Sequence, residues 1–109
     1  MWCLERAVAL ACTVPAQRYG LSPHKGTIAV GADADLTIWD LAREVTVTFA
    51  MQQDRTDDTP YEGRRIRGWA DLTMSRGTVV YRAGEPLVEP GRGRLAHRRP
   101  GTHSRPARV

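Results

Sequence analysis

The stretch KGTIAVGADADLTIWDL, residues 25–41, constrains the fold more than any other part of the chain. Gly26 and Gly31 stand where a chain can turn, and they enclose Thr27–Val30, whose β-branched residues are typical of a short strand. Further on, Leu36–Trp39 again has the apolar composition of a half-buried strand. The stretch therefore predicts two short strands separated by tight turns, in a domain that is mainly β.

The segment before this stretch is predicted to be helical. Residues 4–12, with the sequence LERAVALAC, carry apolar side chains at the spacing of one helix face. Thr13 is expected to cap a second short helix that has Pro15 in its first turn and ends at Gly20.

Further strands are predicted after this stretch. They are Glu44–Thr48, Arg65–Arg67, Leu72–Ser75, Thr78–Tyr81 and Leu87–Val88. Arg76 and Gly77 predict a hairpin turn, and the polar residues 52–63 predict a long loop. Trp39 and Trp69 are expected to lie in the core rather than to bind a ligand.

The length of 109 residues fits one small domain with a modest core. No apolar run approaches the roughly 20 residues of a membrane helix, and no secretory signal pattern precedes residue 25, so we expect a cytoplasmic protein without membrane contact. Cys3 and Cys12 lie nine positions apart without a CxxC pattern. We interpret them as small apolar residues rather than as a disulfide or a zinc site.

The candidate catalytic groups are few. Asp33 and Asp35 could form a carboxylate pair for acid–base chemistry or for a hard cation. The alternative, which we favour, is that they accept hydrogen bonds from backbone amides in a turn. His24, His97 and His103 form no metal-binding motif, and no nucleophile or phosphate-loop pattern is present. From the residues we therefore assign no catalytic, no cofactor-binding and no metal residue.

The last 19 residues, 91–109, differ from the rest in charge. They hold six arginines and no acidic residue, whereas residues 1–90 hold 10 basic and 12 acidic residues. Their Gly, Pro and Arg content predicts a disordered basic tail. Phosphate binding through the arginines is conceivable, but the tail lacks the aromatic residues of single-strand binders, so we do not expect nucleic-acid binding.

Two blocks of the sequence resemble the dihydropyrimidinase and hydantoinase branch of the amidohydrolase superfamily, whose members are cyclic amidases. In the first block the shared positions form a T-x-P-A…G-L-x-P-x-K-G-x-I-x-V-G-x-D-A-D pattern. They are Thr13, Pro15, Ala16, Gly20, Leu21, Pro23, Lys25, Gly26, Ile28, Val30, Gly31, Asp33, Ala34 and Asp35. The second block adds Glu62, Gly63, Gly68, Trp69, Ser75, Arg76, Gly77 and residues 90–94.

The resemblance implies a mixed, mainly β fold that is a C-terminal fragment of such an enzyme. Residues 1–21 would be the last helices of a (β/α)8 barrel, residues 22–90 part of a small β-sandwich (the composite domain), and residues 91–109 the tail. It also implies a hydrolase that opens dihydropyrimidine or hydantoin rings with two divalent ions, usually zinc. The residues that hold the ions in the family have no counterpart here, and Lys25 matches a linker rather than the bridging lysine.

The expected partner is the missing barrel, either in the same enzyme or in a homologous subunit, and the full-length protein is expected to be a homo-oligomer. By this reading the chain supplies scaffold and oligomer contacts and is inactive alone. Two alternatives stay open. One is a stand-alone β-rich interaction module that pairs with a separately encoded barrel. The other, which the residues favour less, is a nucleic-acid binder with a basic tail.

Overall fold

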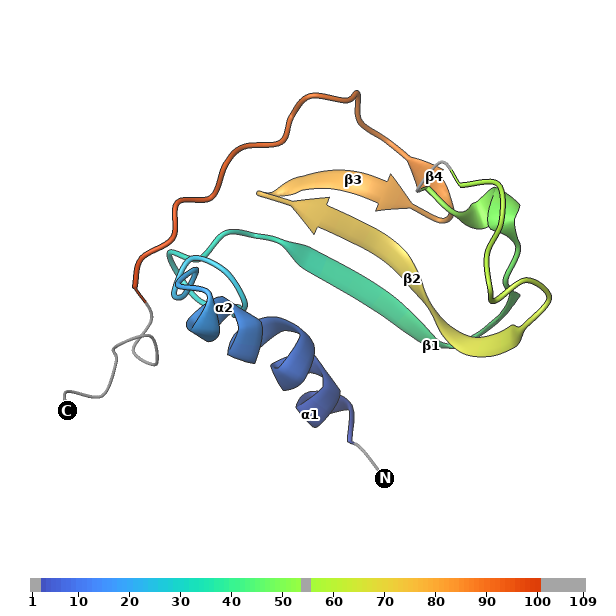
Figure 1. Cartoon of the computed structure of the whole chain (residues 1–109), viewed down its shortest axis with the longest axis horizontal. Coiled ribbons are helices and arrows are strands. Elements are labelled where there is room, and N and C mark those ends of the chain that lie inside the picture. Colours follow the sequence, from blue (N-terminus) through green and yellow to red (C-terminus); the bar gives the residue numbers. More distant parts are fainter. Residues whose placement is uncertain (1–2, 54–55, 101–109) are drawn as a thin grey trace. The chain divides into compact units, whose positions relative to one another are not determined.

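A computed structural model describes residues 3–53 and 56–100, and it divides the chain into two compact units. One unit joins residues 1–34 to residues 89–109, and the other is Asp35–Val88. The first contains the helix and the second an open antiparallel sheet (Figure 1). The assignment of segments to a barrel and to a sandwich stays a prediction.

The helix runs without a break where two helices were predicted. Helix α1 (Leu4–Val8) leads into a π-helical turn, Ala9–Thr13, and this turn leads into α2 (Val14–Arg18). Pro15 lacks an N–H group, and its ring crowds the carbonyl one turn earlier, which the wider π turn accommodates. Thr13 has helical dihedral angles and caps nothing, so the predicted cap is wrong. Its hydroxyl instead donates to the carbonyl oxygen of Gly26, at 2.9 Å.

Gly20 ends the helix, as predicted, with φ of 71°. The N–H of Leu21 donates to the carbonyl oxygen of Ala16 at 2.8 Å, and the N–H of Gly20 donates to that of Gln17 at 3.4 Å. This pair of bonds is the Schellman motif, which requires a left-handed residue at this position.

Residues 27–30 form a loop, so the strand predicted there is wrong. Gly26 and Gly31 have φ of 79° and 88° and turn the chain at both ends. The N–H of Asp33 donates to the carbonyl oxygen of His24 at 2.9 Å and closes the loop. Ile28 and Val30 therefore have no strand partner, and both are fully exposed, at 87% and 108%.

The sheet has four strands in the order β1-β2-β3-β4, all antiparallel. They are β1 (Leu36–Thr46), β2 (Arg65–Ser75), β3 (Thr78–Arg82) and β4 (Glu85–Pro86). A 3-10 turn, Phe49–Met51, follows β1. The strands predicted on either side of residues 40–43 are thus one long strand.

The pairing of β1 with β2 is interrupted between Asp40 and Glu44. There the Asp40 Oδ1 atom accepts hydrogen bonds from the backbone N–H groups of Ala42 and Arg43, at 2.9 and 3.2 Å. Gly68 lies on β2 opposite the interruption, with φ of 97°. The carboxylate of Asp40 therefore supplies bonds that the neighbouring strand does not make.

The hairpin turn predicted at Arg76 and Gly77 is confirmed, and a second turn follows β3. Arg76 and Gly77 have φ of 47° and 78°, and Ala83 and Gly84 have φ of 50° and 103°. Positive φ at both central residues is the two-residue turn that matches the twist of antiparallel strands.

The core among the described residues is small. Only Ala16 and Val47 are buried apolar residues, at 6% and 5% exposure, and no large side chain is fully buried. Trp39 was predicted to be a core residue, but it is 58% exposed, as is its neighbour Ile38 at 57%. An open sheet buries such residues only where another layer covers it, and the described residues leave these two uncovered.

Candidate functional site

The two aspartates at the start of β1 make structural contacts. The Oδ1 atom of Asp35 accepts a hydrogen bond from the backbone N–H of Arg76 at 2.8 Å, and so ties the β2–β3 turn to the start of β1. The Oδ2 atom of Asp33 lies 2.7 Å from the Nζ atom of Lys25, as an ion pair across the loop. We predicted that Asp35 accepts a hydrogen bond from an amide in its own turn. The amide that it binds, that of Arg76, lies instead in a distant turn.

Residues of the second matching block also hold the backbone in place. The Oε2 atom of Glu62 accepts a hydrogen bond from the N–H of Phe49 at 2.6 Å, at the start of the 3-10 turn. The N–H of Gly63 donates to the carbonyl oxygen of Val47 at 2.8 Å. These contacts fix the chain around the loop between β1 and β2, and none of them prepares a reactive group.

The described residues hold no group of three or more His, Cys, Asp or Glu side chains that could bind a metal ion. They therefore do not fit the divalent ions that the family resemblance implies. Cys3 and Cys12 are both free and exposed. Within the same described ranges, no helix has the length and hydropathy to cross a membrane.

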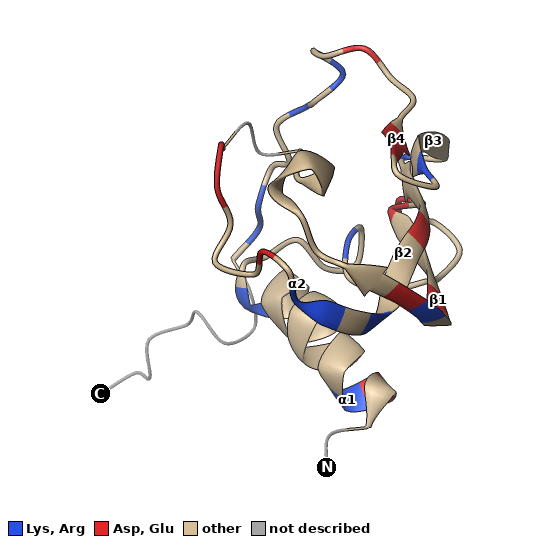
Figure 2. Ribbon diagram, turned by 90° about the vertical axis from the view of Figure 1, so that its right-hand side faces the viewer, with Lys and Arg blue, Asp and Glu red and all other residues tan. Residues whose placement is uncertain are grey.

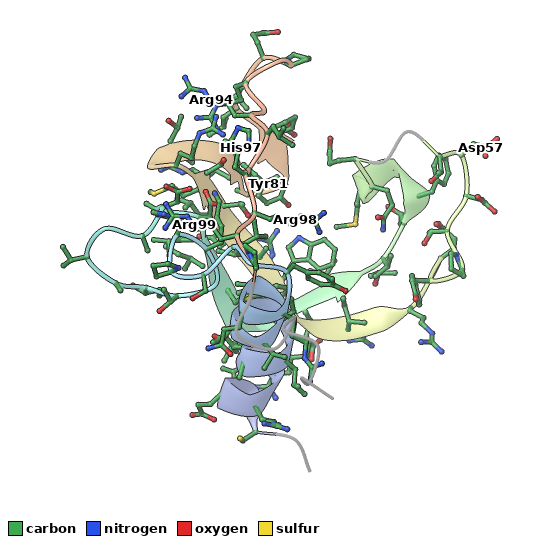
Figure 3. The ribbon with its side chains drawn as sticks, turned by 60° about the vertical axis from the view of Figure 1, so that its left-hand side comes forward. Asp57, Tyr81, Arg94, His97, Arg98 and Arg99 are labelled. Atoms are coloured by element: carbon green, nitrogen blue, oxygen red, sulfur yellow. The ribbon has the colours of Figure 1, made fainter. Side chains whose placement is uncertain are left out.

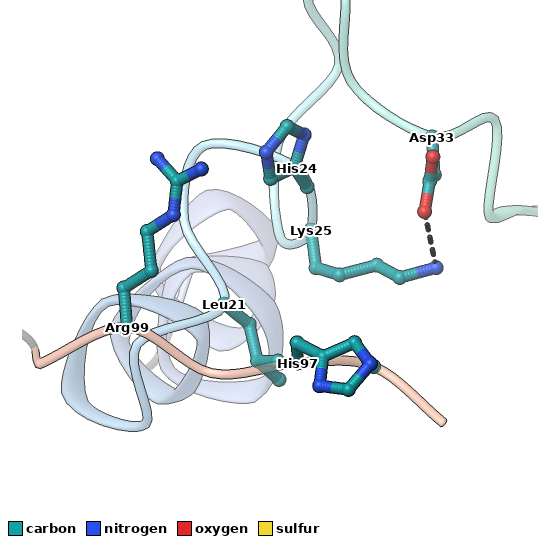
Figure 4. A pocket seen from close by; sticks show the side chains of 7 residues that line it. Leu21, His24, Lys25, Asp33, His97 and Arg99 are labelled. Atoms are coloured by element: carbon teal, nitrogen blue, oxygen red, sulfur yellow. Dashed lines mark ion pairs between the residues drawn. The ribbon is translucent and has the colours of Figure 1, made fainter. Parts of the chain in front are cut away.

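A pocket of about 310 Å³ lies within the helical unit (Figure 4). The residues that line it are Leu21, His24, Lys25 and Asp33 on one wall and Ala96, His97 and Arg99 on the other. His24 and His97 both line it, together with Lys25 and Arg99. The pocket was not predicted from the sequence, because its two walls are about 70 positions apart in the chain.

Residues 91–100 carry arginines and no acidic side chain (Figure 2). They contain no helix or strand, and the N–H of Arg99 donates to the carbonyl oxygen of Gly20 at 2.9 Å. That residues 91–109 form a disordered tail stays a prediction. The remaining part of the predicted tail, residues 101–109 with His103, lies outside the described residues.

Comparison with known proteins assigns the family. The profile described as "Amidohydrolase family" matches residues 1–80, which is most of the chain. The chain belongs to the amidohydrolase family.

Within that family the chain is similar to hydantoinases and dihydropyrimidinases. It is 44% identical over 96 residues to an L-hydantoinase of Paenarthrobacter aurescens, a match that covers 88% of this chain and 21% of the relative. It is 39% identical over 96 residues to a dihydropyrimidinase of Rattus norvegicus, covering 88% and 18%. The chain thus spans about a fifth of the length of the curated relatives it matches.

Solved structures agree with the sequence matches. The dihydropyrimidinase of Brevibacillus agri superposes with a TM-score of 0.86 at 33% identity, over 94% of this chain and 22% of that one. A D-hydantoinase (dihydropyrimidinase) from Thermus sp. gives a TM-score of 0.84 at 39% identity, over 90% and 21%. The resemblance identified from the two sequence blocks is therefore confirmed, and so is the mixed, mainly β fold that it implies.

Proposed function

We propose that this chain is the C-terminal part of a metal-dependent hydrolase that opens cyclic amide rings of the dihydropyrimidine or hydantoin type. It supplies scaffold and oligomer contacts in the cytoplasm and is inactive alone. The observation that carries the proposal is the match of nearly the whole chain to about a fifth of several hydantoinases and dihydropyrimidinases.

The contacts of the matching residues support a scaffold role. Asp35, Glu62 and Gly63 each make a hydrogen bond to backbone that joins segments far apart in the chain. A backbone bond of this kind contributes about 1 kcal/mol of stability. These residues use their polar atoms to hold the backbone together, which is a structural role rather than a catalytic one.

The metal chemistry belongs to the rest of the enzyme under this proposal. Two divalent ions, zinc or similar, would supply metal-assisted hydrolysis there. Histidines, an aspartate and a lysine outside this chain would hold them.

The exposed apolar side chains support a need for a partner. Ile38, Trp39 and Leu41 on β1 are 57%, 58% and 56% exposed, and Leu4 and Val8 on α1 are 57% and 52% exposed. Burial of apolar surface against a partner is favourable by about 25 cal/mol for each Å² removed from water. The partner is the barrel, on the same polypeptide or encoded separately. The second arrangement is the interaction-module alternative.

The first experiment measures the mass of the native polypeptide in its source cells, using an antibody against residues 64–87. A product several times heavier than 12.1 kDa is expected. A product of 12.1 kDa would instead favour the separately encoded partner.

The second experiment is fragment complementation. The L-hydantoinase relative is shortened by the segment that this chain matches, and the chain is co-expressed with it. Hydantoin hydrolysis is expected only when both pieces are present with zinc. Trp39→Ser should reduce the recovered activity several-fold, whereas Asp57→Ser, on an exposed loop, should leave it unchanged. Hydrolysis by the chain alone, or no recovery with the unaltered chain, would refute the proposal.

A further inference from the structure

The pocket in the helical unit has walls that are fixed by backbone bonds. On one side the N–H of Lys25 donates to the carbonyl oxygen of Leu21 at 3.1 Å, and the N–H of Asp33 donates to that of His24 at 2.9 Å. The opposite wall is attached where the N–H of Arg99 donates to the carbonyl oxygen of Gly20 at 2.9 Å. The pocket is therefore part of the folded backbone and does not arise only from mobile side chains.

Gly20 shows how closely the two walls approach. A Cβ atom added there would lie 1.6 Å from the carbonyl oxygen of Arg99. Only a residue without a side chain permits this contact, and the positive φ independently favours glycine. The close approach of Arg99 therefore depends on the glycine in the turn that ends the helix.

Most of the polar side chains that line the pocket are hydrogen-bond donors, and two of them, Lys25 and Arg99, are positively charged. The donors are the guanidinium of Arg99, the ammonium of Lys25 and the imidazoles of His24 and His97 (Figure 4). Asp33 is the one acidic residue that lines it, and its carboxylate is engaged with Lys25 at 2.7 Å. The formal charge of the lining is positive even with both histidines neutral.

We propose that this pocket binds a small molecule that carries an oxyanion, a carboxylate or a phosphate. A guanidinium matches the two oxygens of either group, and the imidazoles in the same lining can donate further hydrogen bonds. The volume of about 310 Å³ exceeds that of a bare ion and is at the lower end of small-ligand sites.

The same charges argue against a cation at this place. His24, His97 and Asp33 include atom types that bind metals, but they do not belong to any metal-binding group among the described residues. A divalent ion would also be repelled by Lys25 and Arg99, which line the same pocket. The oxyanion fits the charge pattern, whereas the metal ion opposes it.

The test is calorimetric titration of the full chain with sodium phosphate and with sodium acetate, against sodium chloride at equal ionic strength. Saturable binding of at least one oxyanion is expected, with a Kd of about 1 mM or below. Binding of one anion and not the other shows whether the pocket takes a phosphate or a carboxylate.

The variants separate the pocket from general attraction of anions. Arg99→Gln should weaken binding about tenfold, because one charge-assisted interaction is lost. Arg98→Gln is the matched control, because Arg98 is adjacent, loses the same charge and does not line the pocket (Figure 3). It should change the Kd less than twofold.

His97→Gln is a second pocket variant, in case Arg99→Gln does not fold, and circular dichroism checks both. It should weaken binding by several-fold. Absence of saturable binding by either oxyanion, or equal weakening by Arg98→Gln and Arg99→Gln, would overturn the inference. Because binding is measured on the chain alone, the result does not depend on the proposed hydrolase function.

Discussion

Two glycines with similar positive φ but different surroundings provide a direct test of how the C-terminal segment is attached. Gly20 and Gly31 have φ of 71° and 88°, so an alanine at either position adopts an unfavourable left-handed conformation. That cost is about 1 kcal/mol at each site. The surroundings differ, because an added Cβ at Gly31 has no atom within 4 Å, whereas at Gly20 it would lie 1.6 Å from the carbonyl oxygen of Arg99.

The expected loss of stability follows from the left-handed conformation at each site and from the close approach of Arg99 at Gly20. Gly31→Ala should lower the free energy of unfolding by about 1 kcal/mol. Gly20→Ala should also separate Arg99 from residue 20 and so lose their hydrogen bond, which contributes about 1 kcal/mol more. The additional 1 kcal/mol corresponds to roughly a fivefold increase in the fraction of chains with this contact open.

Hydrogen–deuterium exchange of the peptide that spans residues 95–100 measures how often the contact between Arg99 and Gly20 opens. Urea unfolding followed by circular dichroism measures the free energy of unfolding of the whole chain. Faster exchange of this peptide is expected in Gly20→Ala and not in Gly31→Ala. Equal exchange in the two variants would refute the reasoning, because it would mean that the close approach of Arg99 to Gly20 does not hold the segment.

Three further predictions concern single contacts. Asp35→Ala removes the acceptor for the N–H of Arg76, so exchange of that amide should become about fivefold faster, and unchanged protection would contradict the assigned contact. Thr13→Val keeps the side-chain shape but loses the hydrogen bond to Gly26, and it should lower the free energy of unfolding by about 1 kcal/mol; an unchanged urea midpoint would count against it. The pKa of Glu5 is lowered because its own backbone N–H and a cysteine side chain bond to its carboxylate. Its contribution to stability is therefore present above the usual glutamate pKa and lost as pH falls through the lower folded value. An NMR titration midpoint at or above the usual value would contradict this.

The local features of the fold could be predicted from the sequence, and the features that depend on distant segments could not. The turn at Arg76 and Gly77 and the helix end at Gly20 follow from residue type, since glycine favours the positive φ that both turns contain. Thr13 looked like a helix cap because nothing nearby indicated its bond to Gly26, 13 residues away.

The exposure of Trp39 could not be read from the sequence for a similar reason. An apolar side chain on a strand indicates a face that is covered in the folded protein, but not which segment covers it. The pocket was missed altogether, because its walls come from opposite ends of the chain and neither wall resembles a known motif.

The carboxylate of Asp40 has a consequence for how this chain behaves in concentrated solution. Strand β1 is the first strand of an open sheet, so a second chain could add to its outer edge and continue the sheet. Two of its amides, those of Ala42 and Arg43, are bonded to Asp40 where the pairing with β2 is interrupted. Replacement of this one aspartate would leave both amides without this acceptor, and unbonded donors on an edge strand favour association with another chain.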